Sequence, residues 1–65
     1  MKVTINGDPC TIDQDLTIAK LVSRLNLEGK FAVEINQHII PRSEYHKRPL
    51  QPGDNIEVVQ AIGGG

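Results

Sequence analysis

The residues with the clearest potential for chemistry are the last five of the chain. Ala61 and Ile62 lead into three glycines, and Gly65 is the final residue. Glycine loses more conformational entropy on folding than any other residue, so a folded domain gains no stability from such a run. The run does form a thin strip of backbone with a carboxylate at its tip, able to thread a channel closed to side chains. We therefore interpret the Gly65 carboxylate as a reactive group, with a frayed terminus as the alternative.

Three other sets of residues could carry chemistry, but each has a simpler interpretation. Cys10 falls at an apolar position of a predicted strand without a cationic or histidine neighbour, which favours a buried structural thiol over a nucleophile. His38 and His46 are eight residues apart and match no zinc signature, so no metal site is expected. Asp13 and Asp15 precede a predicted helix, whose N-terminus favours negative charge, and are not expected to form a catalytic pair.

Length and composition narrow the class of protein. Sixty-five residues predict one small domain, too small for the walls of a deep active-site cleft. The 7 basic and 8 acidic residues, together with an aromatic content of 3%, argue against nucleic-acid binding. No apolar run approaches the length of a membrane span, and the first residues lack the apolar region of a signal peptide. A single cysteine cannot form an internal disulfide, so the chain is expected to be cytoplasmic. It is also expected to be a monomer when free.

The N-terminal residues predict a β-hairpin. Apolar and polar side chains alternate through residues 1–6, which is the pattern of a half-buried strand. Asn6-Gly7 is a strong signal for a tight turn, because both central positions of a type I′ turn favour positive φ. Cys10 and Ile12 continue the inward face on a second strand, where Pro9 fits only near the start or on a sheet edge.

One helix follows the hairpin. Thr17 is a good N-cap, and Gly29 marks the region where the helix has ended. The apolar residues between them fall on one helical stripe. This stripe contains Ile18, Leu21, Val22 and Leu25.

The second half of the sequence predicts further strands around an irregular segment. Residues 31–36 alternate as a third strand, and Gln37-His38 is interpreted as a turn into a short extended piece, Ile39-Ile40. Residues 42–49 are polar and are expected to be irregular, with at most one helical turn. Pro52-Gly53 is a favourable turn pair before the final strand, which contains Ile56 and Val58.

This order of elements predicts an α+β fold of the β-grasp (ubiquitin-like) type. One mixed sheet of four or five strands, with one main helix packed on it, would bury every apolar stripe. A ferredoxin-like sheet is the competing architecture, but it requires a second helix, for which residues 41–49 are a poor candidate. The expected organisation is a domain over residues 1–60 and a flexible glycine tail over residues 61–65.

Two surfaces are candidates for partner binding. If Ile56 and Val58 face the helix, then Val59 and Ala61 lie on the other face of the sheet, where Ala32 joins them. An exposed apolar patch beside the tail favours a partner interface over a substrate pocket. Residues 42–48 contain three basic residues and one acidic residue, and they form either a solvated loop or a docking patch for an acidic partner.

Two segments of the sequence resemble the ThiS family of ubiquitin-like sulfur carriers in thiamine biosynthesis. They are residues 34–45, EINQHIIPRSEY, and residues 50–59, LQPGDNIEVV, which are followed by the glycine end. The resemblance covers essentially the whole chain. Its most specific part is the Ile-Pro-Arg sequence with an aromatic residue, Tyr45, three positions later. A third glycine, Gly63, stands where many members of the family have only two.

The resemblance implies that the chain is a protein co-substrate and not an enzyme, with no catalytic residues, metal or bound cofactor of its own. A ThiF-like adenylyltransferase would use ATP to convert the Gly65 carboxylate to an acyl adenylate. Sulfur from a donor such as a cysteine desulfurase would replace AMP, and the resulting thiocarboxylate would supply a ThiG-like thiazole synthase. Ile62, Gly63 and Gly64 would thread the partner active sites. A molybdopterin-synthase-type sulfur carrier and a ubiquitin-like binding or conjugation module remain as alternatives.

Overall fold

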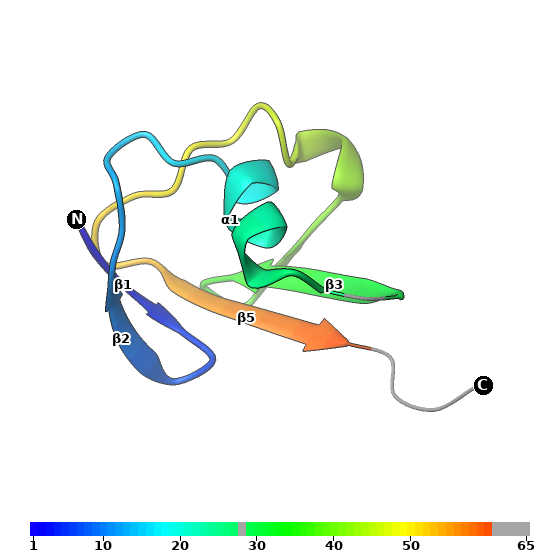
Figure 1. The fold of residues 1–65 in the computed structure, drawn as a ribbon, viewed down its shortest axis with the longest axis horizontal. Coiled ribbons are helices and arrows are strands. Elements are labelled where there is room, and N and C mark those ends of the chain that lie inside the picture. The colour runs from blue at the N-terminus through cyan, green and yellow to red at the C-terminus, as the bar shows by residue number, and fades with distance from the viewer. Residues whose placement is uncertain (28, 61–65) are drawn as a thin grey trace.

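The protein folds as a mixed five-stranded sheet with one α-helix packed on one of its faces (Figure 1). The structure is a computed structural model that describes residues 1–27 and 29–60. Its elements are β1 (Lys2–Ile5), β2 (Asp8–Thr11), α1 (Ile18–Leu25), β3 (Phe31–Ile35), β4 (His38–Ile40), the 3₁₀ turn η1 (Arg42–Glu44) and β5 (Asn55–Gln60). The strand order is β2-β1-β5-β3-β4. The predicted β-grasp arrangement of one mixed sheet and one main helix is confirmed.

The last strand in the sequence lies in the middle of the sheet. β5 pairs in parallel with β1 and antiparallel with β3, so it joins the β1–β2 hairpin to the β3–β4 hairpin. Because successive side chains of a strand point to opposite faces, Ile56 and Val58 face the helix while Glu57 and Val59 face away from it. The exit of the chain from the fold is therefore fixed by its most central strand.

The core lies between the sheet and α1. Val33, Ile35 and Ile56 are completely buried on neighbouring strands, and Ile18 at the start of α1 is completely buried above them. Burying such aliphatic side chains contributes about 1.5–3 kcal/mol each before entropy is counted. The buried apolar side chains among the described residues are Val3, Leu16, Ile18, Leu21, Val33, Ile35, Ile40, Tyr45, Leu50 and Ile56.

The N-terminal hairpin forms as predicted. Asn6 and Gly7 have φ values of 50° and 87°, the left-handed geometry that a type I′ turn requires. The register then sets Val3 opposite Cys10. Pro9 lies on β2, an edge strand, where a residue without an N–H can be tolerated. The hairpin is also tied to the centre of the sheet, because the Val58 N–H donates to the Asn6 side-chain oxygen at 2.8 Å.

The helix begins where predicted and is closed by an asparagine. Thr17 Oγ1 accepts a hydrogen bond from the Lys20 N–H at 3.3 Å, which confirms the N-cap. The C-cap is Asn26, with φ of 54°, so the helix ends before the predicted boundary region at Gly29. Asparagine accepts left-handed geometry more readily than most residues, which lets it close a helix in place of glycine.

The β3–β4 turn lies one residue earlier than predicted. Asn36 and Gln37 have φ values of 52° and 72° and form the turn, whereas His38 is the first residue of β4. The Asn36 side chain explains the shift: its Oδ1 accepts from the Asn55 N–H at 3.0 Å, and its Nδ2 donates to Asp54 Oδ1 at 3.1 Å. These bonds hold Asn36 in left-handed geometry without a glycine to mark the turn.

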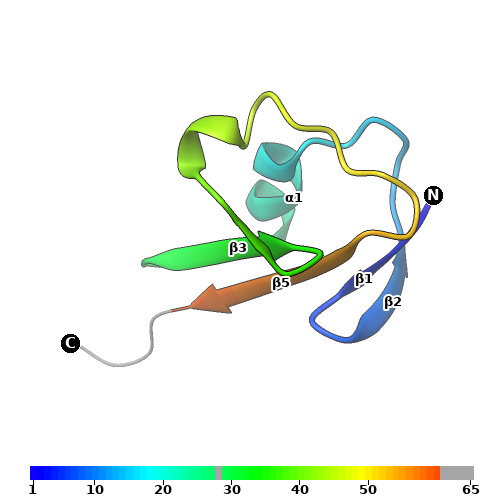
Figure 2. The ribbon, with the colours of Figure 1, turned by 180° about the vertical axis from the view of Figure 1, so that it is seen from behind.

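The connection from β4 to β5 is held against the start of the helix, over which it passes in Figure 2. The Ala19 N–H donates to the Tyr45 carbonyl at 3.0 Å, and the Ile18 N–H donates to the Arg48 carbonyl at 3.3 Å. The first N–H groups of a helix lack partners inside it, so these carbonyls satisfy donors that would otherwise be exposed or unpaired. Residues 42–49 therefore form an ordered segment with one 3₁₀ turn, although their sequence is polar.

Two further observations concern ligands and membranes. Across residues 1–27 and 29–60, no helix is long and apolar enough to cross a membrane. Within the same residues, no group of three or more His, Cys, Asp or Glu side chains is placed to hold a metal ion.

Candidate functional site

The residues predicted to carry the chemistry follow the end of β5. Gly65, the threading residues Ile62, Gly63 and Gly64, and the interface candidate Ala61 all lie outside the described residues. The structure does describe their point of attachment. β5 ends at Gln60, which pairs with Phe31 at the start of β3. In the sequence, Ala61, Ile62 and the three glycines follow this end of the sheet.

The sheet face opposite α1, which we call the open face, brings the two remaining interface candidates together. Val59 on β5 lies directly opposite Ala32 on β3. The Val59 side chain is exposed despite its size, with an exposed fraction of 56%. Directly opposite residues on an antiparallel pair have their Cβ atoms about 5 Å apart, so the two form one apolar patch. Their role in docking stays a prediction.

Ile39 also belongs to the open face, although it was not among the predicted interface residues. Ile39 pairs with Glu34, an open-face position, and is 72% exposed. Its neighbour Ile40 pairs with Val33 and is buried. The signal was present in the sequence: after any tight turn that folds this strand back on β3, one of two consecutive isoleucines must face away from the helix.

The open face also carries a pair of like charges. Glu34 on β3 and Glu57 on β5 are direct cross-strand partners, next to the Val59–Ala32 pair in the same register. Like charges placed directly opposite each other destabilise a sheet. The open face therefore combines large exposed apolar side chains with an acidic centre, and it would suit a partner surface with both apolar and basic groups.

A shallow hollow connects this face to the end of the sheet. Its volume is about 260 Å³, and its lining is mostly apolar. The residues that line it are Lys30, Phe31, Ala32, Val59 and Gln60. The hollow therefore lies beside the point from which the glycine sequence continues.

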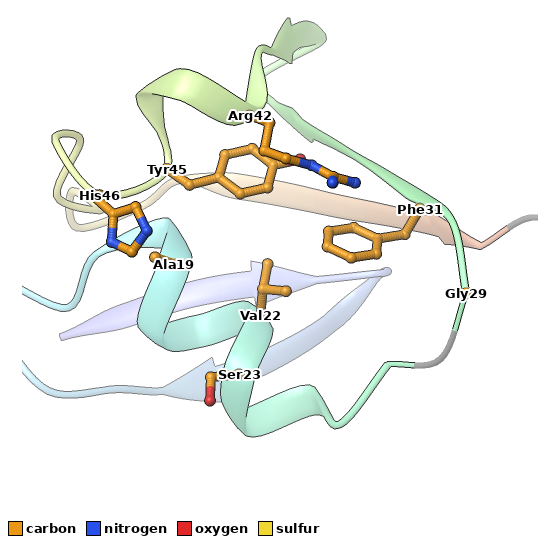
Figure 3. Close-up of a pocket in the computed structure, with 8 residues that line it drawn as sticks. All are labelled: Ala19, Val22, Ser23, Gly29, Phe31, Arg42, Tyr45 and His46. Atoms are coloured by element: carbon orange, nitrogen blue, oxygen red, sulfur yellow. The ribbon is translucent and has the colours of Figure 1, made fainter.

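A second concave surface lies on the other side of the sheet, between α1 and η1 (Figure 3). We call it the helix-side groove. Its volume is about 470 Å³. The lining residues are Ala19, Val22, Ser23, Gly29, Phe31, Arg42, Tyr45 and His46. Its wall is a stack in which the Phe31 and Tyr45 ring centroids lie 6.3 Å apart and the Arg42 guanidinium lies 5.7 Å from the Phe31 centroid.

The other candidate residues do not form a site. Cys10 is half-buried, not fully buried as predicted, because β2 is an edge strand, and its Sγ contacts the Asp8 carbonyl at 3.4 Å. His38 belongs to β4, which forms the opposite edge of the sheet from Cys10. Asp13 forms an exposed ion pair with Arg24 at 3.0 Å, so its carboxylate is engaged with a cation and is not paired with a second carboxylate.

Known proteins share both the sequence and the fold of this chain. A family model described as the ThiS family matches residues 3–65. The sulfur carrier protein ThiS of Bacillus subtilis is 38% identical, over 94% of this chain and 96% of its own length. A crystal structure of thiamine biosynthesis protein ThiS from Geobacter metallireducens aligns with a TM-score of 0.83 and 30% identity, covering 100% of both chains.

A longer protein matches as well. A thiazole synthase of Paramagnetospirillum magneticum is 38% identical over 100% of this chain. The match covers only 20% of that protein, so this chain spans about a fifth of its length.

Proposed function

This chain belongs to the ThiS family of sulfur carrier proteins, and on that basis we propose that it carries sulfur as a thiocarboxylate on Gly65 for thiazole formation in thiamine biosynthesis. The observation that supports this most strongly is the family match itself, because it runs from residue 3 through the terminal glycines. In the sequence, only Ala61 and Ile62 separate these glycines from the end of the central strand β5.

The proposed chemistry begins with activation, because a carboxylate is a poor electrophile. An oxygen of the Gly65 carboxylate attacks the α-phosphate of ATP, pyrophosphate leaves, and an acyl adenylate forms. The terminal sulfur of a persulfide on the donor then attacks the carbonyl carbon and AMP leaves, giving an acyl disulfide. A thiol cleaves the S–S bond, which leaves the sulfur on Gly65 as a thiocarboxylate and joins the donor cysteine to the thiol.

In this proposal the catalytic groups belong to the partners and the chain is their co-substrate. A ThiF-like adenylyltransferase binds the ATP, a donor such as a cysteine desulfurase supplies the persulfide, and a ThiG-like thiazole synthase accepts the sulfur. The longer relative supports the last of these partners, because a segment similar to this chain is part of a thiazole synthase. Ile62, Gly63 and Gly64 act as the strip that reaches into each active site.

The open face is the proposed docking surface for the adenylyltransferase. Val59 and Ala32 form its apolar patch, Ile39 extends the apolar area, and Ala61 follows directly after the strand. A protein interface usually buries an apolar centre with a polar rim. The position of the open face beside the start of the glycine sequence lets a single partner hold the domain and receive its tail.

Mass spectrometry tests the proposal. The chain is incubated with a ThiF-like adenylyltransferase, ATP, a cysteine desulfurase and cysteine, and its intact mass is measured. The expected result is a mass increase equal to the exchange of one oxygen for sulfur, which is lost when Gly65 is deleted. An unchanged mass would favour a ubiquitin-like binding or conjugation module. Sulfur transfer to the large subunit of molybdopterin synthase, but not to thiazole synthase, would favour the molybdopterin-type carrier.

A further inference from the structure

The helix-side groove lies on the face of the sheet opposite the Val59–Ala32 patch, and Phe31 lines both this groove and the hollow beside that patch. Its floor comes from Ala19 and Val22 of α1, and α1 packs on the face of the sheet opposite the Val59–Ala32 patch. Figure 3 shows the groove between α1 and the Arg42–Tyr45 segment, with His46 at one end and Gly29 at the other.

The chemistry of the groove is apolar with a basic rim. The rings of Phe31 and Tyr45 stack at an interplanar angle of 22°, and they form a wall above the aliphatic floor. None of the described residues that line the groove is acidic, while Arg42 and His46 both line it and are exposed. The neighbouring charged residues in the sequence are Glu44, within the 3₁₀ turn, and Lys47 and Arg48 after it.

The Arg42 guanidinium is the main polar group on the rim. It lies over the face of Phe31, which fixes its position, and it forms no ion pair with any described residue. A guanidinium offers a planar set of N–H donors that matches a carboxylate, so an arginine stacked on a ring is already placed to bind one. Arg24, by contrast, forms an ion pair with Asp13.

We propose that the helix-side groove docks an acidic segment of a partner protein, with an aromatic or large aliphatic side chain of that segment seated against Phe31, Tyr45 and Val22. A carboxylate of the segment pairs with Arg42. The volume of about 470 Å³ accommodates one such side chain and its neighbours. The basic rim favours acidic partners. The apolar wall favours those acidic partners that carry an aromatic or large aliphatic side chain. The site uses neither Gly65 nor the open face, so it extends beyond the proposed function.

A peptide titration tests this site on the whole chain. The ¹⁵N-labelled protein is titrated with a capped peptide of sequence Glu-Asp-Phe-Asp-Glu, and amide chemical shifts are followed by NMR. Saturable shifts are expected at Val22, Phe31, Tyr45 and His46. Replacing the peptide phenylalanine with alanine, or introducing Arg42→Gln, should each weaken binding by about tenfold or more.

A matched variant tests whether binding depends on the charge of Arg42 or on any positive charge of the chain. Lys2→Gln removes one positive charge on β1, away from the groove, and should leave binding within about twofold, since exposed charges contribute little individually. Equal binding of the alanine peptide, an equal loss in Lys2→Gln, or shifts outside the groove would overturn the site. Equally tight binding of N-acetylphenylalanine would replace the protein segment with a small amphipathic ligand.

This test is independent of sulfur transfer. A protein that acquires no thiocarboxylate but still binds the peptide through Arg42 would contradict the proposed function and keep the groove. A protein that acquires sulfur normally but shows no peptide binding would support the proposed function and contradict the groove as a docking site.

Discussion

At the residue scale, two candidates for chemistry separate clearly. Cys10 lies half-buried on an edge strand opposite Val3, and its thiol contacts a backbone carbonyl. Gly64 precedes the terminal Gly65 carboxylate and contributes only backbone. The Cys10 thiol therefore lies within the fold, whereas the Gly65 carboxylate follows the last strand in the sequence. Substitutions at the two positions distinguish which group accepts sulfur.

Cys10→Ser is expected to retain sulfur acquisition. Replacing the thiol with a hydroxyl at a half-buried site should lower the free energy of unfolding by about 1 kcal/mol or less. The thiocarboxylate should still form on Gly65 at the parental rate, as measured by intact mass. Cys10→Ala serves as the control for loss of polarity. A folded Cys10→Ser protein that acquires no sulfur would show that the thiol belongs to the relay.

Gly64→Ala is expected to be a poor substrate for adenylation. If the glycine strip threads a narrow channel, one methyl group moves the reacting carboxylate, and a misplacement of about 1 Å can lower the rate about a hundredfold. Deleting Gly65 retracts the carboxylate by about 3.5 Å and should abolish turnover. Pyrophosphate release with ATP and the adenylyltransferase measures both effects. Thermal melts verify folding, and an unchanged Gly64→Ala rate would exclude threading.

At the element scale, the turns decide where the strands run. Asn36 closes the β3–β4 hairpin and binds Asp54 and Asn55, which come just before and at the start of β5. Asp54 is itself buried and also accepts from the Gln51 N–H at 2.8 Å. One asparagine therefore links the β3–β4 turn to the turn that leads into the central strand.

Asn36→Ala is expected to destabilise the fold by about 2–3 kcal/mol. Each lost hydrogen bond contributes about 1 kcal/mol, and alanine in left-handed geometry adds about 1 kcal/mol more. Asn36→Gly accommodates the positive φ but loses the same bonds, so it should be less destabilising than Asn36→Ala. Urea unfolding of the three proteins measures the difference. Equal stabilities of the alanine variant and the parent would show that the side-chain bonds contribute nothing.

Sequence patterns predicted the elements better than the connections between them. The alternation in β1 and β3, the Thr17 cap and the Asn6-Gly7 turn depend on neighbouring residues, so local rules found them. The Asn36-Gln37 turn depends on bonds to residues 54 and 55, far along the sequence, and was displaced by one residue. The order in residues 42–49 likewise comes from the helix start against which they lie.

At the scale of the whole molecule, the charged side chains beside the Val59–Ala32 patch differ from those that line the helix-side groove. The open face carries the Glu34–Glu57 pair, whereas Arg42 and His46 line the helix-side groove. The candidate site could be predicted only in part from the sequence, because some of its residues come together only through strand register and tertiary packing. Sequence parity placed Val59 and Ala32 on one face, but the cross-strand register was needed to bring the glutamates together, and the groove required tertiary packing.

Val59→Asp is expected to weaken binding to the adenylyltransferase by about tenfold or more while leaving the isolated fold intact. The new carboxylate lies near the Glu34–Glu57 pair and interrupts the apolar patch. Thr11→Asp adds the same charge on the same face of the sheet, but on the edge strand β2, which β1 separates from β5, and it should bind normally. Isothermal titration measures both affinities. Equal affinities of Val59→Asp and the parent would remove the open face as the docking surface.

The central position of β5 has a consequence for synthesis of the chain. Among the described residues, each hairpin pairs with β5 and not with the other hairpin. The bond between Asn6 and Val58 closes a separation of 52 residues. Such long-range pairings form late and cooperatively. On the ribosome, the sheet therefore stays incomplete until its last strand emerges. A chain that ends before that strand lacks both the completed sheet and the glycines.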